Sequence, residues 1–264
     1  MPDLTGYVAV VTGASKGIGK GIALGLGEYG ATVYLTGRSS SDAPGALSVE
    51  NTARAVDELG GTGVPVVLDH NDDAAVAGLF ERVAKEAGRL DILVNNVYQI
   101  PDPPAFSGGF WEHPIRIWDD QCGVGLRGYY TASVFAAPLM IQRGSGLIVN
   151  ISSRGGRGYV FNTAYGVGKA GVDRMAQDMA HELADYGVAA LSLSPSKVKT
   201  EFILEQIERG ELPPLDPAVA QSVRLSGRVI AALATASDRM EISGGIYTVA
   251  EMAERYEVID PDRE

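Results

Sequence analysis

The chain is poor in several residue types, and each shortage narrows what the protein can be. It has one cysteine, Cys122, so no internal disulfide can form and a reducing compartment is natural. It has three histidines, His70, His113 and His181, which stand without the spacing of metal ligands. We therefore expect neither a disulfide framework nor a metal site.

Positive charge and long apolar runs are also scarce. The chain has 22 Lys and Arg against 33 Asp and Glu, and the net charge of −11 argues against unspecific binding to nucleic acid or to an anionic membrane. The longest apolar run, ASVFAAPLMI, is about half as long as a membrane span. No signal peptide is visible. We expect a cytoplasmic protein without a transmembrane segment or a nucleic-acid partner, although local cations can still hold an anionic ligand.

Short apolar runs alternate with segments of helical periodicity. The helical pattern is clearest at 51–61 and at 74–88, which ends at a glycine stop signal. The alternation predicts an α/β fold, a Rossmann-type doubly wound parallel sheet of about seven strands with helices on both faces. The runs are nearly continuously apolar, as in strands buried on both faces. The predicted strands are 7–13, 31–37, 64–69, 90–96, 146–152, 188–194 and 244–250.

The length of 264 residues fits one large α/β domain, although two small domains would also fit. We find no repeat, low-complexity tract or linker, and predict a single Rossmann-fold domain over 1–264. Two segments interrupt the alternation, near 97–114 and 200–217. Both follow the carboxyl ends of predicted strands, where open α/β sheets bind ligands, so we expect substrate-side insertions there.

A glycine-rich turn, TGASKGIG, joins the first predicted strand to a predicted helix. Gly13, Gly17 and Gly19 allow backbone N–H groups to approach a pyrophosphate, which the positive end of the helix also attracts. The spacing Gly-x-x-x-Gly-x-Gly differs from the commoner dinucleotide fingerprint. Its place between a strand and an apolar helix nevertheless predicts a dinucleotide site.

The end of the second predicted strand favours NADP(H) over NAD(H). Gly37 stands where an acid would hold the free ribose 2′-hydroxyl of NAD. Arg38 follows, and Lys16 adds a second cation, so both can pair with the 2′-phosphate of NADP; the alternative is two solvated cations. Asp69, at the end of the third predicted strand, is placed to meet the adenine or to cap the next helix. NAD(H) stays as the alternative cofactor.

Tyr165 and Lys169 stand four residues apart in AYGVGKAG, so both side chains would lie on one face of a helix. A phenol with a pKa near 10 shuttles protons poorly at neutral pH, and a nearby ammonium lowers that pKa. The spacing therefore indicates an acid–base pair. Taken alone, it is also compatible with two exposed side chains.

With these residues in hand, the chain resembles a classical short-chain dehydrogenase/reductase. TGASKGIG resembles that family's cofactor loop, YGVGK its Tyr-x-x-x-Lys motif, and PSKVKT its Pro-Gly-x-Val-x-Thr segment. Asn95 and Asn96 resemble the start of its Asn-Asn-Ala-Gly motif, and Ser153 matches its catalytic serine. The match covers 5–250. A closer likeness, to the dehydrogenase/reductase SDR family member 1 group, is carried by FWEHPIRIWDDQCGVGLRGYY, YGVGKAGVDRMAQDMAHEL and AEMAERY.

The resemblance implies an NADP(H)-dependent oxidoreductase that interconverts a ketone or aldehyde and an alcohol, working as a homo-oligomer (dimer or tetramer). Tyr165 would be the general acid/base, Ser153 would donate to the carbonyl oxygen, and Lys169 would also hold the nicotinamide ribose. The implied cofactor-binding residues are Gly13, Ser15, Lys16, Gly17, Ile18, Gly19, Arg38, Asp69, Asn95, Tyr165, Lys169, Pro195, Val198 and Thr200.

The chain departs from the family pattern in several places. Val97 and Tyr98 replace Ala-Gly, and Ser196 replaces the glycine after Pro195. Gly125 falls where the family has a helix-borne catalytic asparagine. The C-terminal stretch lacks the usual Asp-Gly-Gly, which puts the common tetramer contact in doubt. A catalytically weakened NADP(H)-binding sensor or scaffold therefore stays an alternative, as does a dehydratase or epimerase of the same fold.

The substrate is not identified by the sequence. Aromatic residues in and near the first insertion suggest an apolar ketone, although a role in the core explains them almost as well: Tyr98, Phe110, Trp111 and Tyr159. Arg154 and Arg157 follow the matched serine and are either solvated or placed to meet an anionic substrate.

Overall fold

A computed structural model describes residues 2–102 and 105–263. The chain forms two compact units, which are described separately. The first consists of Met1–Val67, Pro195–Arg239 and Tyr247–Glu264, and the second of Leu68–Ser194 and Met240–Ile246. The single domain over 1–264 stays a prediction.

The first unit is built on three parallel strands. In register, Val8 lies opposite Thr32, which in turn lies opposite Thr62. The strands are β1 (Val8–Val11), β2 (Thr32–Gly37) and β3 (Thr62–Val67). Its helices are α1 (Gly17–Gly27), α2 (Val49–Glu58), α7 (Glu201–Glu208), α8 (Leu225–Thr235) and α9 (Val249–Arg255).

Helices α1 and α8 approach closely because both carry glycine at the contact. A Cβ on Gly21 would lie 2.0 Å from the carbonyl oxygen of Val223, and one on Gly227 would lie 2.5 Å from that of Ile22. Any larger residue would push the two helices apart. This packing fixes where α1 begins, and therefore the position of the glycine-rich turn before it.

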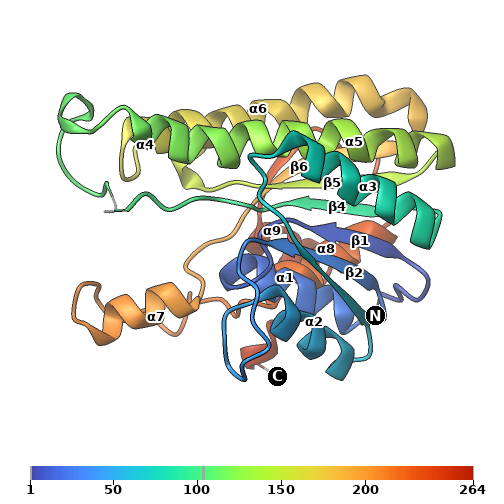
Figure 1. Cartoon of the computed structure of the whole chain (residues 1–264), viewed down its shortest axis with the longest axis horizontal. Helices are drawn as coiled ribbons and strands as arrows, with labels where there is room; N and C mark the ends of the chain where they lie inside the picture. The colour runs from blue at the N-terminus through green and yellow to red at the C-terminus, as the bar shows by residue number, and fades with distance from the viewer. Residues whose placement is uncertain (1, 103–104, 264) are drawn as a thin grey trace. The chain divides into compact units, whose positions relative to one another are not determined.

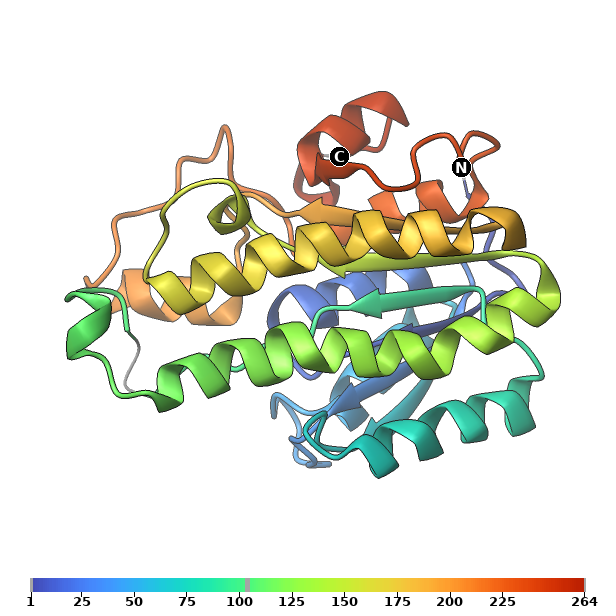
Figure 2. The ribbon, with the colours of Figure 1, turned by 90° about the horizontal axis from the view of Figure 1, so that it is seen from above.

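The second unit holds a second set of parallel strands, all of whose residues are buried. They are β4 (Ile92–Asn95), β5 (Gly146–Ile151) and β6 (Val188–Ser194). Three long helices lie along one face of these strands, and α5 and α6 run side by side (Figures 1 and 2). They are α3 (Asp73–Ala87), α5 (Gly128–Arg143) and α6 (Thr163–Leu183).

Short helical turns surround these elements. They are η1 (Phe110–Glu112), α4 (Arg116–Trp118), η3 (Arg154–Gly156), η4 (Ala184–Tyr186) and η5 (Pro261–Arg263). A π-helix, η2 (Asp119–Arg127), leads directly into α5. No helix of the described part of the chain is both long and apolar enough to span a membrane.

The strand order is β3-β2-β1-β4-β5-β6-β7, with β7 at Ile246–Thr248. This is the order of a doubly wound Rossmann sheet, so the predicted fold class is confirmed. The seven predicted strands and the two clearest helices are present, and Gly88 ends α3 in a left-handed conformation with φ of 68°.

One expectation needs correction. The third strand begins and ends two residues earlier than predicted, and its side chains are partly exposed, because β3 lies at the edge of the sheet. The segment 200–217 contains α7, whose first turn is capped by Thr200, and its role as a substrate-side insertion stays a prediction. Residues 103–104 of the other predicted insertion, 97–114, lie outside the described residues.

Candidate active site

The first turn of α6 positions the predicted acid–base pair. Asn162 ends an extended segment, and its side-chain oxygen accepts a hydrogen bond from the backbone N–H of Tyr165 at 2.9 Å. An asparagine in this place is a preferred helix cap, because it satisfies an N–H group that the helix leaves free. Helix α6 therefore starts at Thr163, with Tyr165 in its first turn and Lys169 one turn later.

Ser153 and Tyr165 are in direct contact. The Tyr165 hydroxyl donates to the Ser153 Oγ at 2.9 Å, and the backbone N–H of Gly155 donates to the same oxygen at 2.9 Å. Both lone pairs of the serine oxygen are thus used, and no described residue accepts its hydrogen. The Ser153 hydroxyl is therefore free to donate to a third group, such as a carbonyl oxygen.

Gly155 makes this contact possible. A Cβ at position 155 would lie 2.6 Å from Cε1 of Tyr165 and 3.0 Å from Oγ of Ser153. The first distance is too short for a Cβ atom and the second is tight, so a larger residue would have to displace the Tyr165 ring. Gly155 was not among the predicted site residues.

The environment of Tyr165 corrects one part of the sequence argument. Burial raises the pKa of Tyr165, while the hydrogen bond with Ser153 and the positive charge of Arg154 act in the opposite direction. Lys169 was expected to lower this pKa below its usual value, and that expectation is wrong for this structure. Arg154 is exposed, and its positive charge lowers the pKa of Tyr165.

Lys169 is buried, and its ammonium is held inside the unit. Its Nζ donates to the backbone carbonyl oxygen of Ile151 at 2.9 Å. The same nitrogen lies over two aromatic rings, 5.4 Å from the centroid of Tyr98 and 5.7 Å from that of Tyr129. Burial lowers the pKa of Lys169 to about 8, although the nearby carboxylate of Asp173 acts in the opposite direction.

Aromatic side chains and an apolar pocket lie beside the first turn of α6. The ring of Phe161 meets that of Tyr165 edge-on, with centroids 5.1 Å apart. A pocket of about 220 Å³ is lined by side chains from 110–118 together with Asn162, Thr163 and Ala164. Phe110 lines this pocket, and both Phe110 and Trp111 are well exposed, at 66% and 75%. They are therefore not core residues.

The glycine-rich turn lies in the first unit and has the expected backbone geometry. Gly13 and Gly17 have φ of 69° and 60°, which glycine adopts without strain. The carboxylate of Glu201 accepts from the backbone N–H of Gly17 at 2.8 Å, so this helix end already holds an oxyanion group. The Gly17 N–H group is thus engaged by Glu201 in this structure, and the carboxylate would have to leave it before a phosphate could be bound there.

The segment after β6 meets this turn within the same unit. The methyl group of Thr200 lies 3.8 Å from where a Cβ on Gly17 would stand. Val198 is buried and bridges Gln221, while Pro195 precedes it in the same segment. The structure therefore brings together the predicted cofactor residues of the turn and of this segment. Of the turn residues, Ser15 is buried, Ile18 and Gly19 begin α1, and Lys16 is exposed.

The end of β2 has little room for an acidic side chain. A Cβ on Gly37 would lie 3.1 Å from Val49 and 3.4 Å from Ser15. Arg38 follows on the exposed side of the strand end. An acid that binds the ribose 2′-hydroxyl of NAD would therefore need rearrangement at position 37, which fits the predicted preference for NADP(H).

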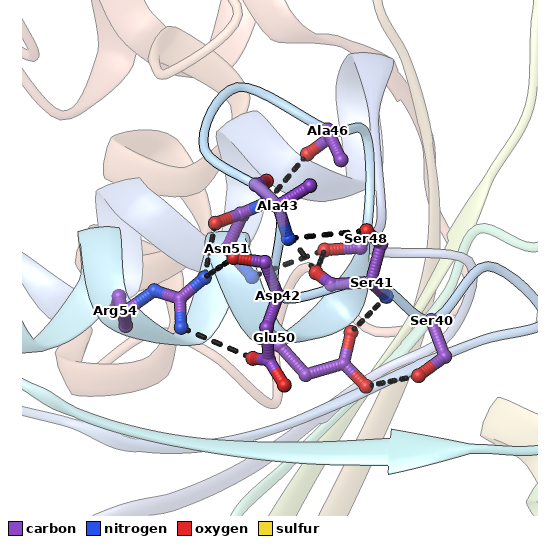
Figure 3. Close-up of polar contacts among 9 residues, drawn as sticks. All are labelled: Ser40, Ser41, Asp42, Ala43, Ala46, Ser48, Glu50, Asn51 and Arg54. Carbon is purple, nitrogen blue, oxygen red and sulfur yellow. Dashed lines mark hydrogen bonds and ion pairs between the residues drawn. The ribbon is translucent and has the colours of Figure 1, made fainter.

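The loop after Arg38 is tied down by polar contacts (Figure 3). The carboxylate of Glu50 accepts from the Ser40 hydroxyl at 2.6 Å and from the Ser41 N–H at 3.1 Å. The Asn51 side chain donates to the carbonyl oxygens of Ala43 and Ala46 at 2.8 and 2.9 Å. The sequence does not predict this network, because its residues lie in a polar loop without a recognisable motif.

Asp69 and Asn95 belong to the second unit, as do Ser153, Tyr165 and Lys169. The Asp69 carboxylate accepts from the backbone and side chain of Asn71, and Asp72, not Asp69, caps α3. The Asn95 side chain is buried and donates to Ser133 and to Asn150, at 2.9 Å each. The Asn95 amide nitrogen therefore links β4, α5 and β5, whereas its buried side-chain oxygen has no hydrogen-bond partner among the described residues.

We expect Asn95→Ala to lower the free energy of unfolding by about 1–3 kcal/mol, because two buried acceptors lose their donor. Urea unfolding of the two proteins measures this difference. Equal unfolding midpoints would show that these hydrogen bonds do not stabilise the fold.

Comparison with known proteins identifies the family to which the chain belongs. A family model described as short chain dehydrogenase matches residues 7–209. The chain belongs to this family of oxidoreductases, as the sequence motifs predicted.

Similar proteins show which group within the family this chain resembles. Dehydrogenase/reductase SDR family member 1 of Mus musculus is 45% identical over 98% of this chain and 84% of its own length, and the Homo sapiens protein is 44% identical over the same shares. The predicted likeness to this group is confirmed.

Among solved structures, a short chain dehydrogenase from Mycobacterium thermoresistibile matches with a TM-score of 0.80 and 26% identity, covering 97% of this chain and 89% of that one. A short-chain type dehydrogenase/reductase from Mycobacterium marinum has a TM-score of 0.78 and 26% identity, covering 93% and 94%.

Proposed function

We propose that this chain is an NADP(H)-preferring oxidoreductase that interconverts an apolar ketone or aldehyde and the corresponding alcohol. The observation that carries the proposal is the contact between Tyr165 and Ser153, with a buried ammonium one helical turn away. A proton donor and a hydrogen-bond donor converge there, which is what carbonyl reduction requires of the protein.

In the reduction, NADPH supplies the hydride to the carbonyl carbon. Tyr165 gives its hydroxyl proton to the carbonyl oxygen, and Ser153 donates a hydrogen bond to the same oxygen as negative charge builds on it. The positive charge of Arg154 favours the phenolate left on Tyr165, and the ammonium of Lys169 would hold the nicotinamide ribose when the cofactor is bound. In the oxidation, Tyr165 accepts the proton from the alcohol.

The glycine-rich turn is the part of the chain that we assign to the dinucleotide phosphates. Its left-handed glycines and helix end suit a pyrophosphate, and Thr200 borders it. Arg38 and Lys16 are the cations that we assign to the 2′-phosphate. The 220 Å³ pocket beside α6 supports an apolar substrate, because side chains such as Phe110 and Trp118 line it.

The direct test is cofactor consumption by the purified protein over a panel of apolar aldehydes and ketones. We expect loss of the reduced-nicotinamide absorbance with at least one of them, faster with NADPH than with NADH. Cofactor binding without turnover over the whole panel would instead favour the sensor or scaffold alternative.

Arg38→Asp is expected to shift the cofactor preference towards NAD(H). Removing one charge-assisted hydrogen bond to the 2′-phosphate costs about 1.5–3 kcal/mol, or roughly 10- to 150-fold in the ratio of NADPH to NADH affinity. The two dissociation constants can be measured by the fluorescence of each reduced cofactor.

Arg54→Ala is the matched control, because Arg54 is a cation near the same loop that is engaged with Asp42 and Asn51 (Figure 3). We expect it to leave the cofactor ratio within about twofold, the scale of an exposed ion pair. An unchanged ratio in Arg38→Asp would show that Arg38 does not meet the 2′-phosphate.

A further inference from the structure

Tyr98 and Gly125 fit into one another. Gly125 is buried in the π-helix, and a Cβ at this position would lie 2.9 Å from Cδ2 and 3.5 Å from Cε2 of Tyr98. An aromatic ring carbon is part of a rigid group and cannot yield like the end of a flexible chain. The ring of Tyr98 therefore takes the space that any side chain at 125 would need.

The same ring touches both members of the acid–base pair. It meets the ring of Tyr165 edge-on, at an interplanar angle of 84° and a centroid distance of 5.9 Å. The Lys169 Nζ lies 5.4 Å from the Tyr98 centroid, within the range of a cation–π contact. Since Lys169 is buried, such a contact replaces part of the hydration that its charge has lost.

The hydroxyl of Tyr98 has a different role from its ring. Burial, followed by the nearby Tyr165 and Cys122, raises the pKa of Tyr98 well above its usual range, although a hydrogen bond with Gln121 acts in the opposite direction. The phenol therefore stays neutral at any pH at which the protein works. Tyr98 therefore contacts Lys169 through the face of an uncharged ring.

Lys169 also has neighbours other than Tyr98. Asp173, on the same helix, raises its pKa, and Tyr129, from α5, presents a second ring at 5.7 Å. The remaining titratable neighbours act on the tyrosines: Arg154 on Tyr165, and Cys122 and Asp120 on Tyr98. Tyr98 has ring contacts with both Lys169 and Tyr165.

We propose that Tyr98 is a positioning residue of this site, because its ring holds the Lys169 ammonium and flanks Tyr165. Gly125 is required, since the Tyr98 ring occupies the space that a side chain at position 125 would take. The inference rests on the proposed function for its consequence in catalysis. The contact between Tyr98 and Lys169 is tested independently of turnover below.

The first test compares two substitutions of Tyr98. Tyr98→Phe keeps the ring, so we expect it to retain at least about a third of the wild-type kcat. Tyr98→Leu removes the ring, and we expect kcat to fall about tenfold or more while KM for NADPH changes less. A cation–π contact of this kind also supports the protonated lysine, so the upper limb of the pH–rate profile should move down by about half to one pH unit in Tyr98→Leu.

The second test is a double-mutant cycle. Gly125→Ala should lower kcat about tenfold in the wild-type background, because its Cβ displaces the Tyr98 ring. In the Tyr98→Leu background the same change should cost less than about threefold, since the flexible leucine can move aside. Equal losses in the two backgrounds would overturn the proposed fit between the two residues.

The third test needs no substrate. The titration of Lys169 can be followed by NMR in protein labelled with ¹³C-lysine, with Lys169→Met to assign the signal. We expect the midpoint to fall by about half to one pH unit in Tyr98→Leu and to stay within about 0.3 in Tyr98→Phe. An unchanged or higher midpoint in Tyr98→Leu would overturn the proposal. If the wild-type protein reduces no carbonyl, the proposed function fails, while this titration still decides the role of Tyr98.

Discussion

Tyr165→Phe is expected to lower kcat for carbonyl reduction by about 10²–10⁴-fold, the usual contribution of a positioned general acid. The phenyl ring keeps the edge-on contacts with Tyr98 and Phe161, so the packing of the first turn of α6 is preserved. Only the proton donor and its hydrogen bond to Ser153 are lost. NADPH affinity should therefore stay within about threefold, as measured by cofactor fluorescence.

Tyr159→Phe is the matched control for this substitution. Tyr159 is exposed, and its hydroxyl donates to the backbone carbonyl oxygen of Phe161 at 3.1 Å, so it too loses one hydrogen bond close to the site. We expect its kcat to stay within about twofold of the wild type. If Tyr165→Phe kept most of the wild-type activity, Tyr165 would not be the general acid.

The spacing of Tyr165 and Lys169 was enough to place both on one helix, because helical neighbours are a local property of the chain. The sign of the pKa shift on Tyr165 was not predictable in the same way. It depends on burial beside the rings of Tyr98 and Phe161, and burial outweighs the hydrogen bond with Ser153 and the positive charge of Arg154. Likewise, the exposure of β3 follows from its place at the sheet edge, which its apolar residues do not reveal.

The contact between Tyr98 and Gly125 shows a second limit of the sequence. Each departure from the family pattern was visible by itself, a bulky residue in one motif and a missing side chain in another. Their relation depends on the path of the π-helix, because a Cβ at position 125 would lie 2.9 Å from the Tyr98 ring. Gly125 therefore matches Tyr98 in shape. The missing side chain at position 125 is then not by itself a reason to regard the chain as a weakened enzyme.

Lys169→Met is expected to make the protein more stable at neutral pH while abolishing turnover. Burial lowers the pKa of Lys169 to about 8 in the folded protein, below the value of 10.5 of a free lysine. The unfolded chain therefore binds a proton more tightly, and the folded state carries a penalty of about 3 kcal/mol below pH 8. Methionine fills a similar volume without a charge. The Ile151 carbonyl oxygen that loses the ammonium still accepts from the Tyr129 hydroxyl at 3.2 Å.

The pH dependence gives this prediction its sharpest form. Because the folded pKa is lowered, the stability of the wild type should rise as pH increases from about 8 to 10.5, and its difference from Lys169→Met should shrink over the same window. Urea unfolding at pH 7 and at pH values across this window measures both effects. Lys85→Met, at an exposed position on α3, is the control and should show no such convergence. If Lys169→Met were less stable than the wild type at pH 7, the buried ammonium would be a net support of the fold, and this prediction would be wrong.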